Sequence, residues 1–238
     1  MSLCVIQMSK PIDRPPHGSA LTIKTRLSPY LSRVQRLRLH RWMFKKTWSV
    51  VSQLSNQEVV PYVFLAARQD YDDVHASLDR FVKACDNSRK SEDSSHKSQQ
   101  KPRLQDGVNL GARIKNACLT VISECNPSHI IIVGADCPSL TAADFDRASR
   151  ALKEGSDAYV IPALDGGYVM LAFSRACFEM HASELLDDIP WGTERVFDIT
   201  IARMKNNKIS VTCGKPLSDI DEFCDLKALP TSTYLESS

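Results

Sequence analysis

Residues 130–138 read Ile-Ile-Ile-Val-Gly-Ala-Asp-Cys-Pro. An unbroken apolar run of this kind is typical of a strand covered on both faces, as in a parallel sheet with helices above and below it. In such sheets ligands bind beyond the carboxyl ends of the strands, which is where Asp136 would lie. A carboxylate there is suited to holding a divalent cation against phosphate oxygens. Asp136 could instead cap the next helix, but Thr141 fits that role, and we favour the metal ligand.

The composition is that of an ordinary globular protein. The 238 residues are 43% hydrophobic and 24% charged, which suits one large α/β domain. A formal net charge of +2 gives no reason to expect a nucleic-acid partner, and no apolar stretch is long enough to span a membrane. The eight cysteines never form a Cys-x-x-Cys pair. This argues against structural zinc and favours a reduced, cytoplasmic compartment.

One basic region leaves organelle targeting open. Residues 14–57 contain nine Lys or Arg residues and no acidic residue, a composition also found in mitochondrial transit peptides. Apolar residues in this region recur at helical spacing: Val34, Leu37, Phe44, Trp48 and Val51. We therefore expect a helix of the folded domain, basic on its other faces. Its predicted start is Ser28-Pro29, with Ser28 as the N-cap.

Strands and helices alternate along most of the chain. Strands are expected over 3–8, 59–66, 130–133, 159–161, 168–173 and 209–213, and a turn over 104–107. Helices are expected over 71–85, from Asn109 to 125, from Thr141 to Gly155, from Thr193 to 207, and briefly near the end of the chain. This order predicts a Rossmann-like three-layer αβα sandwich, whose mainly parallel sheet has an antiparallel addition near Asp165.

The whole chain, 1–238, is expected to form a single domain interrupted by one polar segment. Residues 86–103 lack hydrophobic side chains and are rich in Ser, Lys, Gln and acidic residues. Such a segment cannot bury enough surface to offset its ordering entropy, and we expect a disordered insertion.

Two cations and a glycine pair are candidates for contacts with a ligand. Lys24 and Arg26 follow the first strand, where α/β proteins often bind phosphates, although a Lys-x-Arg pair is common on any surface. Asp165-Gly166-Gly167 can let the backbone approach a ligand, or can form a tight turn between strands. The sequence has neither a P-loop nor a dinucleotide fingerprint, and none of its six histidines lies in a motif.

A second acidic pair and one arginine remain ambiguous. Asp219 and Asp221 flank Ile220, so both carboxylates could point to one side and complete a metal site with Asp136. Asp221 could equally cap a helix. Arg113 lies near a helix start and is either an exposed cation or a nucleotide contact.

Six motifs occur in a fixed order along the chain. They are Lys24-Thr25-Arg26-Leu27-Ser28-Pro29, Leu104-Gln105-Asp106-Gly107 with Leu110-Gly111-x-Arg113, Gly134-Ala135-Asp136-Cys137-Pro138, Asp165-Gly166-Gly167-Tyr168, Ile189-Pro190-Trp191-Gly192-Thr193, and Asp219-Ile220-Asp221 through Asp225-Leu226. This series resembles the rSAM/selenodomain-associated transferase family, a branch of the nucleotide-diphospho-sugar transferase (glycosyltransferase A) fold. It is more remotely similar to the 2-phospho-L-lactate and molybdenum-cofactor guanylyltransferases.

The resemblance implies roles for particular residues. A nucleotide would lie over the first strands, with Lys24 and Arg26 near its phosphates as catalytic groups beside Asp136. Mg²⁺ or Mn²⁺ would bind Asp136, with Asp219 or Asp221 as the second acidic ligand. Further nucleotide- or substrate-binding positions implied in this way are Gln105, Gly111, Arg113, and Asp165, Gly166 and Gly167 on the acceptor side.

Two departures from the family pattern concern the geometry of the site. Gly18 lies farther ahead of Lys24 than the family pattern has it, which indicates an insertion in the phosphate loop. Glu222, Phe223 and Cys224 replace the Thr-Pro-Glu type of sequence usual before the terminal Asp-Leu.

The sequence thus predicts a metal-dependent transferase that uses a nucleoside triphosphate or a nucleotide-sugar and a small-molecule acceptor. Glycosyl and nucleotidyl transfer both fit, and the oligomeric state stays open. The alternative is a non-catalytic nucleotide sensor or scaffold that retains the fold. Nucleic-acid binding through the basic region would require steep salt dependence, and the low net charge disfavours it.

Overall fold

The computed structural model describes residues 2–10, 12, 23–54, 59–66 and 102–230. The helix expected over 71–85, with Asp70 as its cap, and nearly all of the polar segment 86–103 lie outside these residues. The described part of the chain contains no helix that is both long enough and apolar enough to cross a bilayer.

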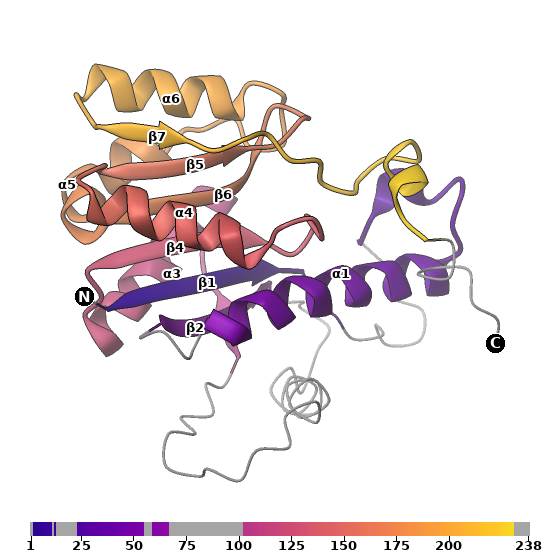
Figure 1. Ribbon diagram of the computed structural model, residues 1–238. Helices are drawn as coiled ribbons and strands as arrows, with labels where there is room; N and C mark the ends of the chain where they lie inside the picture. Colours follow the sequence, from indigo (N-terminus) through magenta and orange to yellow (C-terminus); the bar gives the residue numbers. More distant parts are fainter. Residues whose placement is uncertain (1, 11, 13–22, 55–58, 67–101, 231–238) are drawn as a thin grey trace, which may run out of the picture.

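A seven-stranded sheet forms the centre of the molecule (Figure 1). Its strands are β1 (Leu3–Ser9), β2 (Val59–Ala66), β3 (Arg103–Gln105), β4 (His129–Gly134), β5 (Ala158–Pro162), β6 (Tyr168–Ser174) and β7 (Val211–Cys213). They lie side by side in the order β3-β2-β1-β4-β6-β5-β7. Only β6 runs antiparallel to its neighbours among these seven strands. The predicted mainly parallel sheet with an antiparallel addition is therefore confirmed.

Helices cover both faces of the sheet and complete the predicted αβα sandwich. They are α1 (Arg33–Gln53), α3 (Leu110–Cys125), α4 (Ala142–Lys153), α5 (Arg175–Leu186) and α6 (Val196–Asn206), with 3₁₀ turns η1 (Thr25–Leu27) and η3 (Asp225–Ala228). Residues of α3, α5 and α6 pack together on one face of the sheet, and residues of α1 and α4 on the other. The fold is thus a three-layer sandwich with one hydrophobic layer on each side of the sheet.

Strand β4 shows why its sequence is apolar at every position. Ile130 and Ile132 belong to the layer under α3 and α5, whereas Ile131 and Val133 pack in the layer under α4. All four side chains are buried. Because successive strand residues point to opposite faces, a strand covered on both sides needs hydrophobic residues throughout.

One predicted turn is a strand, and one observed helix was not predicted. Leu104 and Gln105, expected in a turn, belong to the short edge strand β3, which pairs with the end of β2. Helix α5 between β6 and α6 was not predicted at all. Ser174 caps it by accepting a hydrogen bond from the Cys177 backbone N–H, directly after the strand ends.

Two predicted helix starts are also wrong. Helix α1 starts at Arg33 rather than at Ser28-Pro29, because Ser32 and Gln35 form a reciprocal capping box there. As a result Val34 stands on the exposed side, although the other members of the predicted stripe are buried or half-buried. Helix α6 starts at Val196, beyond Thr193, whose hydroxyl donates to the Pro190 carbonyl.

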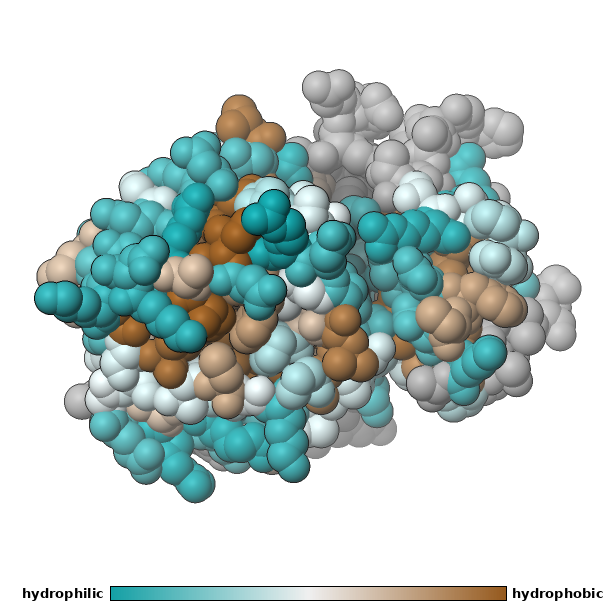
Figure 2. Space-filling view, turned by 90° about the horizontal axis from the view of Figure 1, so that it is seen from above, coloured by the Kyte–Doolittle hydropathy of each residue, from teal (hydrophilic) through white to brown (hydrophobic). Residues whose placement is uncertain are grey.

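A small hydrophobic cluster extends the molecule beyond one end of the sheet. It joins η1, the first half of α1 and the segment around η3 through Leu27, Leu31, Leu39, Met43, Ile220 and Leu226. Figures 1 and 2 show this end of the molecule standing out from the sheet, on the right in both views. The cluster fixes η1 and the last described residues at the carboxyl ends of β1 and β4.

Candidate functional site

Asp136 lies just past the end of β4, where the strand order reverses between β1 and β4. This switch point is where open α/β sheets bind their ligands. The carboxylate oxygen Oδ1 is buried and faces two side chains, with Lys24 Nζ at 3.1 Å and His40 Nδ1 at 3.8 Å. About half of the Asp136 side chain is exposed, so the carboxylate is open to a ligand on its other side.

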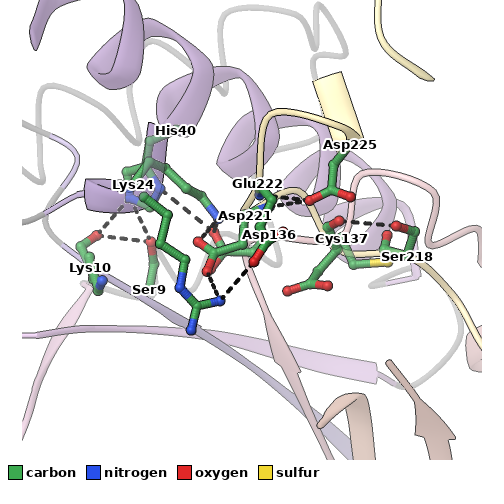
Figure 3. A network of polar contacts seen from close by, with 12 residues as sticks. Ser9, Lys10, Lys24, His40, Asp136, Cys137, Ser218, Asp221, Glu222 and Asp225 are labelled. Carbon is green, nitrogen blue, oxygen red and sulfur yellow. Dashed lines mark hydrogen bonds and ion pairs between the residues drawn. The ribbon is translucent and has the colours of Figure 1, made fainter. Parts of the chain in front are cut away.

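Lys24 places its ammonium between two carboxylates (Figure 3). Its Nζ lies 3.1 Å from Asp136 Oδ1 and 3.6 Å from Asp221 Oδ1, and its side chain is only 4% exposed. The residue precedes η1 in the left-handed region, with φ of 48°, which is uncommon for a residue other than glycine. The local backbone thus directs a buried cation at the end of β4.

Backbone contacts bring Asp221 to Asp136 across a long stretch of sequence. The Ile220 N–H donates to the Asp136 carbonyl at 3.0 Å, and the Ile220 side chain is buried in the cluster beyond the sheet. Asp225 Oδ2 accepts hydrogen bonds from the backbone N–H groups of Asp221 and Glu222, at 3.0 and 2.7 Å. Asp225 therefore holds the turn that presents Asp221, a role that sequence analysis missed.

Arg26 completes the charged group on its solvent side. Its Nη1 lies 3.0 Å from Asp221 Oδ2 and 3.9 Å from a carboxylate oxygen of Glu222. More than half of the Arg26 side chain is exposed, unlike that of Lys24. The predicted catalytic residues Lys24, Arg26 and Asp136 are thus brought together with the predicted metal ligand Asp221.

His40 is a second residue that sequence analysis missed. It comes from α1, is almost fully buried, and its Nε2 lies 3.3 Å from Ser9 Oγ and 3.2 Å from the Lys10 carbonyl. Burial lowers the pKa of His40, although Asp136 opposes this effect. Its place on the buried face of α1, between Leu37 and Phe44, was a readable signal, because a polar residue inside an apolar stripe needs a partner.

The pKa is lowered for Asp136 and raised for Asp219. Burial alone would raise the pKa of Asp136, but Lys24, with smaller contributions from His40 and Lys10, brings it below its ordinary value. Burial and then the charge of Asp165 raise the pKa of Asp219 to about 6, against the attraction of Lys24. Asp219 is therefore in the field of the site, but Asp221 is the residue paired with Lys24 and Arg26.

The candidate residues Gln105, Gly111 and Arg113 make internal contacts. Gln105 Nε2 donates to the carbonyls of Ser9 and Phe64, at 2.9 and 3.0 Å, and so ties together the ends of β1 and β2. A Cβ on Gly111 would lie 2.0 Å from the Leu186 carbonyl oxygen, so this glycine permits close packing of α3 on the end of α5. Arg113 Nε donates to the Gly107 carbonyl.

The Asp165–Gly167 motif forms a turn between β5 and β6. Asp165 Oδ1 accepts the Gly167 N–H at 2.9 Å, and Ala163 N–H donates to the Gly167 carbonyl at 3.0 Å. Gly166 has a φ of +89°, and a Cβ there would lie 2.1 Å from the Glu194 carbonyl oxygen. The close approach that this glycine permits is therefore to the loop before α6. The charge of Asp165 also acts on Asp219, whose pKa it helps to raise.

The donor set of Asp136 and Asp221 fits a hard divalent cation. Both carboxylates already surround one cationic group, the Lys24 ammonium, which marks a position that is favourable for positive charge. Mg²⁺ is commonly held by one or two carboxylates and keeps its remaining positions for water and substrate phosphates. Within the ranges that the structure describes, no three His, Cys, Asp or Glu side chains are arranged to hold an ion by themselves. Phosphate or water would have to supply the other ligands.

The strand order and flanking helices define the nucleotide-diphospho-sugar transferase fold. A protein from Desulfovibrio desulfuricans G20, named provisionally a nucleotide-diphospho-sugar transferase, has a crystal structure that superposes with a TM-score of 0.76 at 23% sequence identity. The match covers 100% of this chain and 90% of that one. Residues 65–193 match the family described as "Uncharacterized protein conserved in bacteria (DUF2064)". The chain belongs to this family.

More distant structures share the same fold. CMP:2-keto-3-deoxy-manno-octonic acid synthetase complexed with CTP has a TM-score of 0.52 at 12% identity, over 96% of each chain. Rv0371C from Mycobacterium tuberculosis H37Rv, in complex with manganese, has a TM-score of 0.50 at 13% identity, over 96% of this chain and 98% of that one. No curated protein matches the chain.

Proposed function

We propose that this protein is a Mg²⁺- or Mn²⁺-dependent transferase that acts on a nucleoside triphosphate or a nucleotide-sugar and passes part of it to a small-molecule acceptor. The observation that carries the proposal is the convergence of Asp136 and Asp221 on Lys24 at the switch point of the sheet. Two structures of the same fold were solved with CTP and with manganese, which is in keeping with such a ligand pair.

The residues of this chain have complementary parts in the proposal. Asp136 and Asp221 would hold the ion, which supplies neutralisation of charge on the phosphates and on the leaving pyrophosphate or nucleoside diphosphate. Lys24 and Arg26 supply fixed positive charge where phosphate charge must be stabilised. Asp219 tunes the field behind the pair, and the Asp165–Gly167 turn forms the wall on the acceptor side.

The finer assignments belong to the same proposal. The motif series supports membership of the rSAM/selenodomain-associated transferases within the broader fold. We also propose that residues 1–238 act as one domain in the cytoplasm, with Gln105, Gly111 and Arg113 shaping the nucleotide side of the site through the contacts described above.

The product distinguishes the two transfer reactions. Purified protein is incubated with Mn²⁺ and separate panels of nucleoside triphosphates and nucleotide-sugars, in the presence of a mixed small-molecule acceptor extract. Release of pyrophosphate identifies nucleotidyl transfer, and release of a nucleoside diphosphate identifies glycosyl transfer. Metal-dependent stabilisation by a nucleotide without any turnover would contradict catalysis and favour a sensor.

Replacing one carboxylate tests the role of the pair. Asp136→Asn keeps the size of the side chain but removes its negative charge, and we expect turnover to fall by roughly 10²–10³-fold, as when one group that stabilises transition-state charge is lost. Glu179→Gln is the matched control, because Glu179 pairs with Arg175 at 2.7 Å and the Arg175 backbone binds Ser128 just before β4, at the opposite end of that strand from Asp136. Folded Asp136→Asn protein with the turnover of the wild type would contradict the proposed role of the carboxylate pair.

A further inference from the structure

We propose that Lys24 is an internal counter-ion that takes the place of the divalent cation in the nucleotide-free protein and competes with it for the carboxylate pair. Binding of metal with phosphates then transfers the ammonium from the carboxylates to the phosphate oxygens. This inference rests on the proposed function and adds a specific role for one residue within it.

The position of the ammonium is the first support. Nζ lies 3.1 Å from Asp136 Oδ1 and 3.6 Å from Asp221 Oδ1, so one positive charge is shared by two carboxylates from distant parts of the sequence. The side chain is 4% exposed, and the backbone that carries it is left-handed, with φ of 48°. A buried group held in this way cannot simply be solvated elsewhere, and displacing it requires another cation on the carboxylates.

The surroundings of Asp136 Oδ1 are the second, independent support. This oxygen is buried, and among the described residues it makes no hydrogen bond other than its ion-pair contacts. His40 Nδ1, on a side chain that is 2% exposed, points at it from 3.8 Å and is itself without a hydrogen-bond partner among those residues. Two buried polar atoms therefore face each other without a hydrogen bond, and the Lys24 ammonium lies closer to the carboxylate oxygen than His40 does, as expected beside a ligand position.

Arg26 does not share this role. It contacts the other oxygen of Asp221, Oδ2, at 3.0 Å and lies on the exposed side of the pair. It could therefore stay on Asp221 if a metal ion were bound by the carboxylate pair. A metal ion must displace Lys24 from the carboxylates, whereas Arg26 can keep its contact with Asp221.

Competition of this kind makes metal and phosphate binding cooperative. Metal alone must break two ion pairs and leave a buried ammonium without a partner, so its affinity is low. Metal with a polyphosphate gives the ammonium new partners, so each ligand strengthens binding of the other by the same factor. The site would then bind free divalent cations only weakly when no polyphosphate is present.

The experiment measures protein-bound Mn²⁺ by equilibrium dialysis, because triphosphate itself chelates Mn²⁺ and would remove the signal of the free ion without any protein. It is carried out with and without inorganic triphosphate, which supplies phosphates without a base. In wild-type protein we expect weak binding of Mn²⁺ alone and much stronger binding with triphosphate. Lys24→Met removes the competing charge and leaves two uncompensated carboxylates, so Mn²⁺ alone should bind at least about tenfold tighter than to the wild type. Triphosphate should then strengthen Mn²⁺ binding by a smaller factor than it does in the wild type.

Two further variants serve as controls. Arg175→Met breaks the pair with Glu179 near the start of β4, at the opposite end of that strand from Asp136, and should leave Mn²⁺ affinity unchanged. Lys24→Gln should behave like Lys24→Met, which covers a folding failure of either variant, as checked by thermal unfolding. Equal or weaker binding of Mn²⁺ alone to folded Lys24→Met overturns this inference while the proposed function stands. If wild-type protein binds no Mn²⁺ even with triphosphate, the proposed function itself is overturned, and the inference with it.

Discussion

Asp219 is the acidic residue of the site whose charge the fold disfavours. Its carboxyl is half-buried, and its pKa is raised to about 6 by burial first and by the charge of Asp165 second. The folded protein therefore binds a proton between about pH 4 and 6 that the unfolded chain does not bind. The folded state is therefore stabilised by protonation of Asp219. This contribution to the free energy of unfolding is fully present at low pH and is lost as the pH rises through about 6.

The pH dependence predicts a stabilising substitution. Asp219→Asn should stabilise the fold by about 1 kcal/mol at pH 7.5, allowing for screening by solvent, and the gain should vanish near pH 4. Urea unfolding curves at the two pH values measure this difference. Asp146→Asn, at an exposed position on α4, is the control and should change little at either pH. A gain that is the same at both pH values would contradict the assignment.

Single residues of the site were readable from the sequence only where they belong to a pattern. Asp136 follows an apolar strand, and Lys24 and Arg26 follow the first one, so their placement at the same edge of the sheet could be predicted. Asp225 carries no such signal, because its carboxylate acts on the backbone of its own turn. His40 was missed although it interrupts an apolar stripe, since its partners come from the end of β1.

The segment from Ile220 to η3 is the element on which the carboxylate pair depends. Asp225 accepts two backbone hydrogen bonds from it, and the Ile220 N–H binds the Asp136 carbonyl. None of these three hydrogen bonds joins two strands of the sheet. Loss of the Asp225 carboxylate should therefore loosen the site far more than the fold.

Asp225→Ala tests this separation. We expect a loss of about 1–2 kcal/mol in stability, typical of a lost cap, with a drop of at least about tenfold in Mn²⁺–triphosphate affinity. Calorimetry gives the stability, and equilibrium dialysis gives the affinity. Asp144→Ala is the matched control: its carboxylate caps α4 through the Thr141 N–H at 2.8 Å, so it should cost similar stability without changing the affinity. If both variants bind alike, Asp225 does not position the site.

Strands and helix caps differed in how well their sequences predicted them. The strand β2 was predicted at its observed bounds, Val59–Ala66, and the Asn109 and Thr141 caps at the observed residues. Helix α1 was predicted to start too early, since Ser-Pro is a helix-start signal that here lies in the turn after η1. Helix α5 follows β6 without a loop, so the sequence has no turn residues there that would indicate a helix start.

Ligand binding should be visible in the stability of the whole molecule. Because the carboxylate pair exists only when η1, β4 and the last described segment are assembled, ligands should bind the folded state alone. At a hundred times its Kd, Mn²⁺ with triphosphate should add about 2.7 kcal/mol to the free energy of unfolding, and Mn²⁺ alone much less at the same concentration. Differential scanning calorimetry measures the shift, and excess chelator should abolish it. An equal shift with Mn²⁺ alone would argue against coupling.

The layered architecture could be predicted from the sequence, but the contacts that assemble the site could not. Alternating strands and helices gave the layered sheet, because hydrophobic periodicity reports which faces are covered. The order β3-β2-β1-β4-β6-β5-β7 is set by pairing between strands far apart in sequence, which no local pattern encodes. The contact of Asp221 with Lys24 depends on that order, so from the residues alone the second carboxylate remained one of two alternatives.

The reversed direction of β6 has a consequence for how such proteins diversify. Because β6 begins at the edge where its neighbours end, a short reversal at 163–167 suffices to join β5 to it. That reversal packs on the loop before α6 through Gly166, and neither segment supplies the carboxylate pair. Under the proposed function, changes in these two segments would alter the acceptor side of the site and leave Asp136 and Asp221 in place.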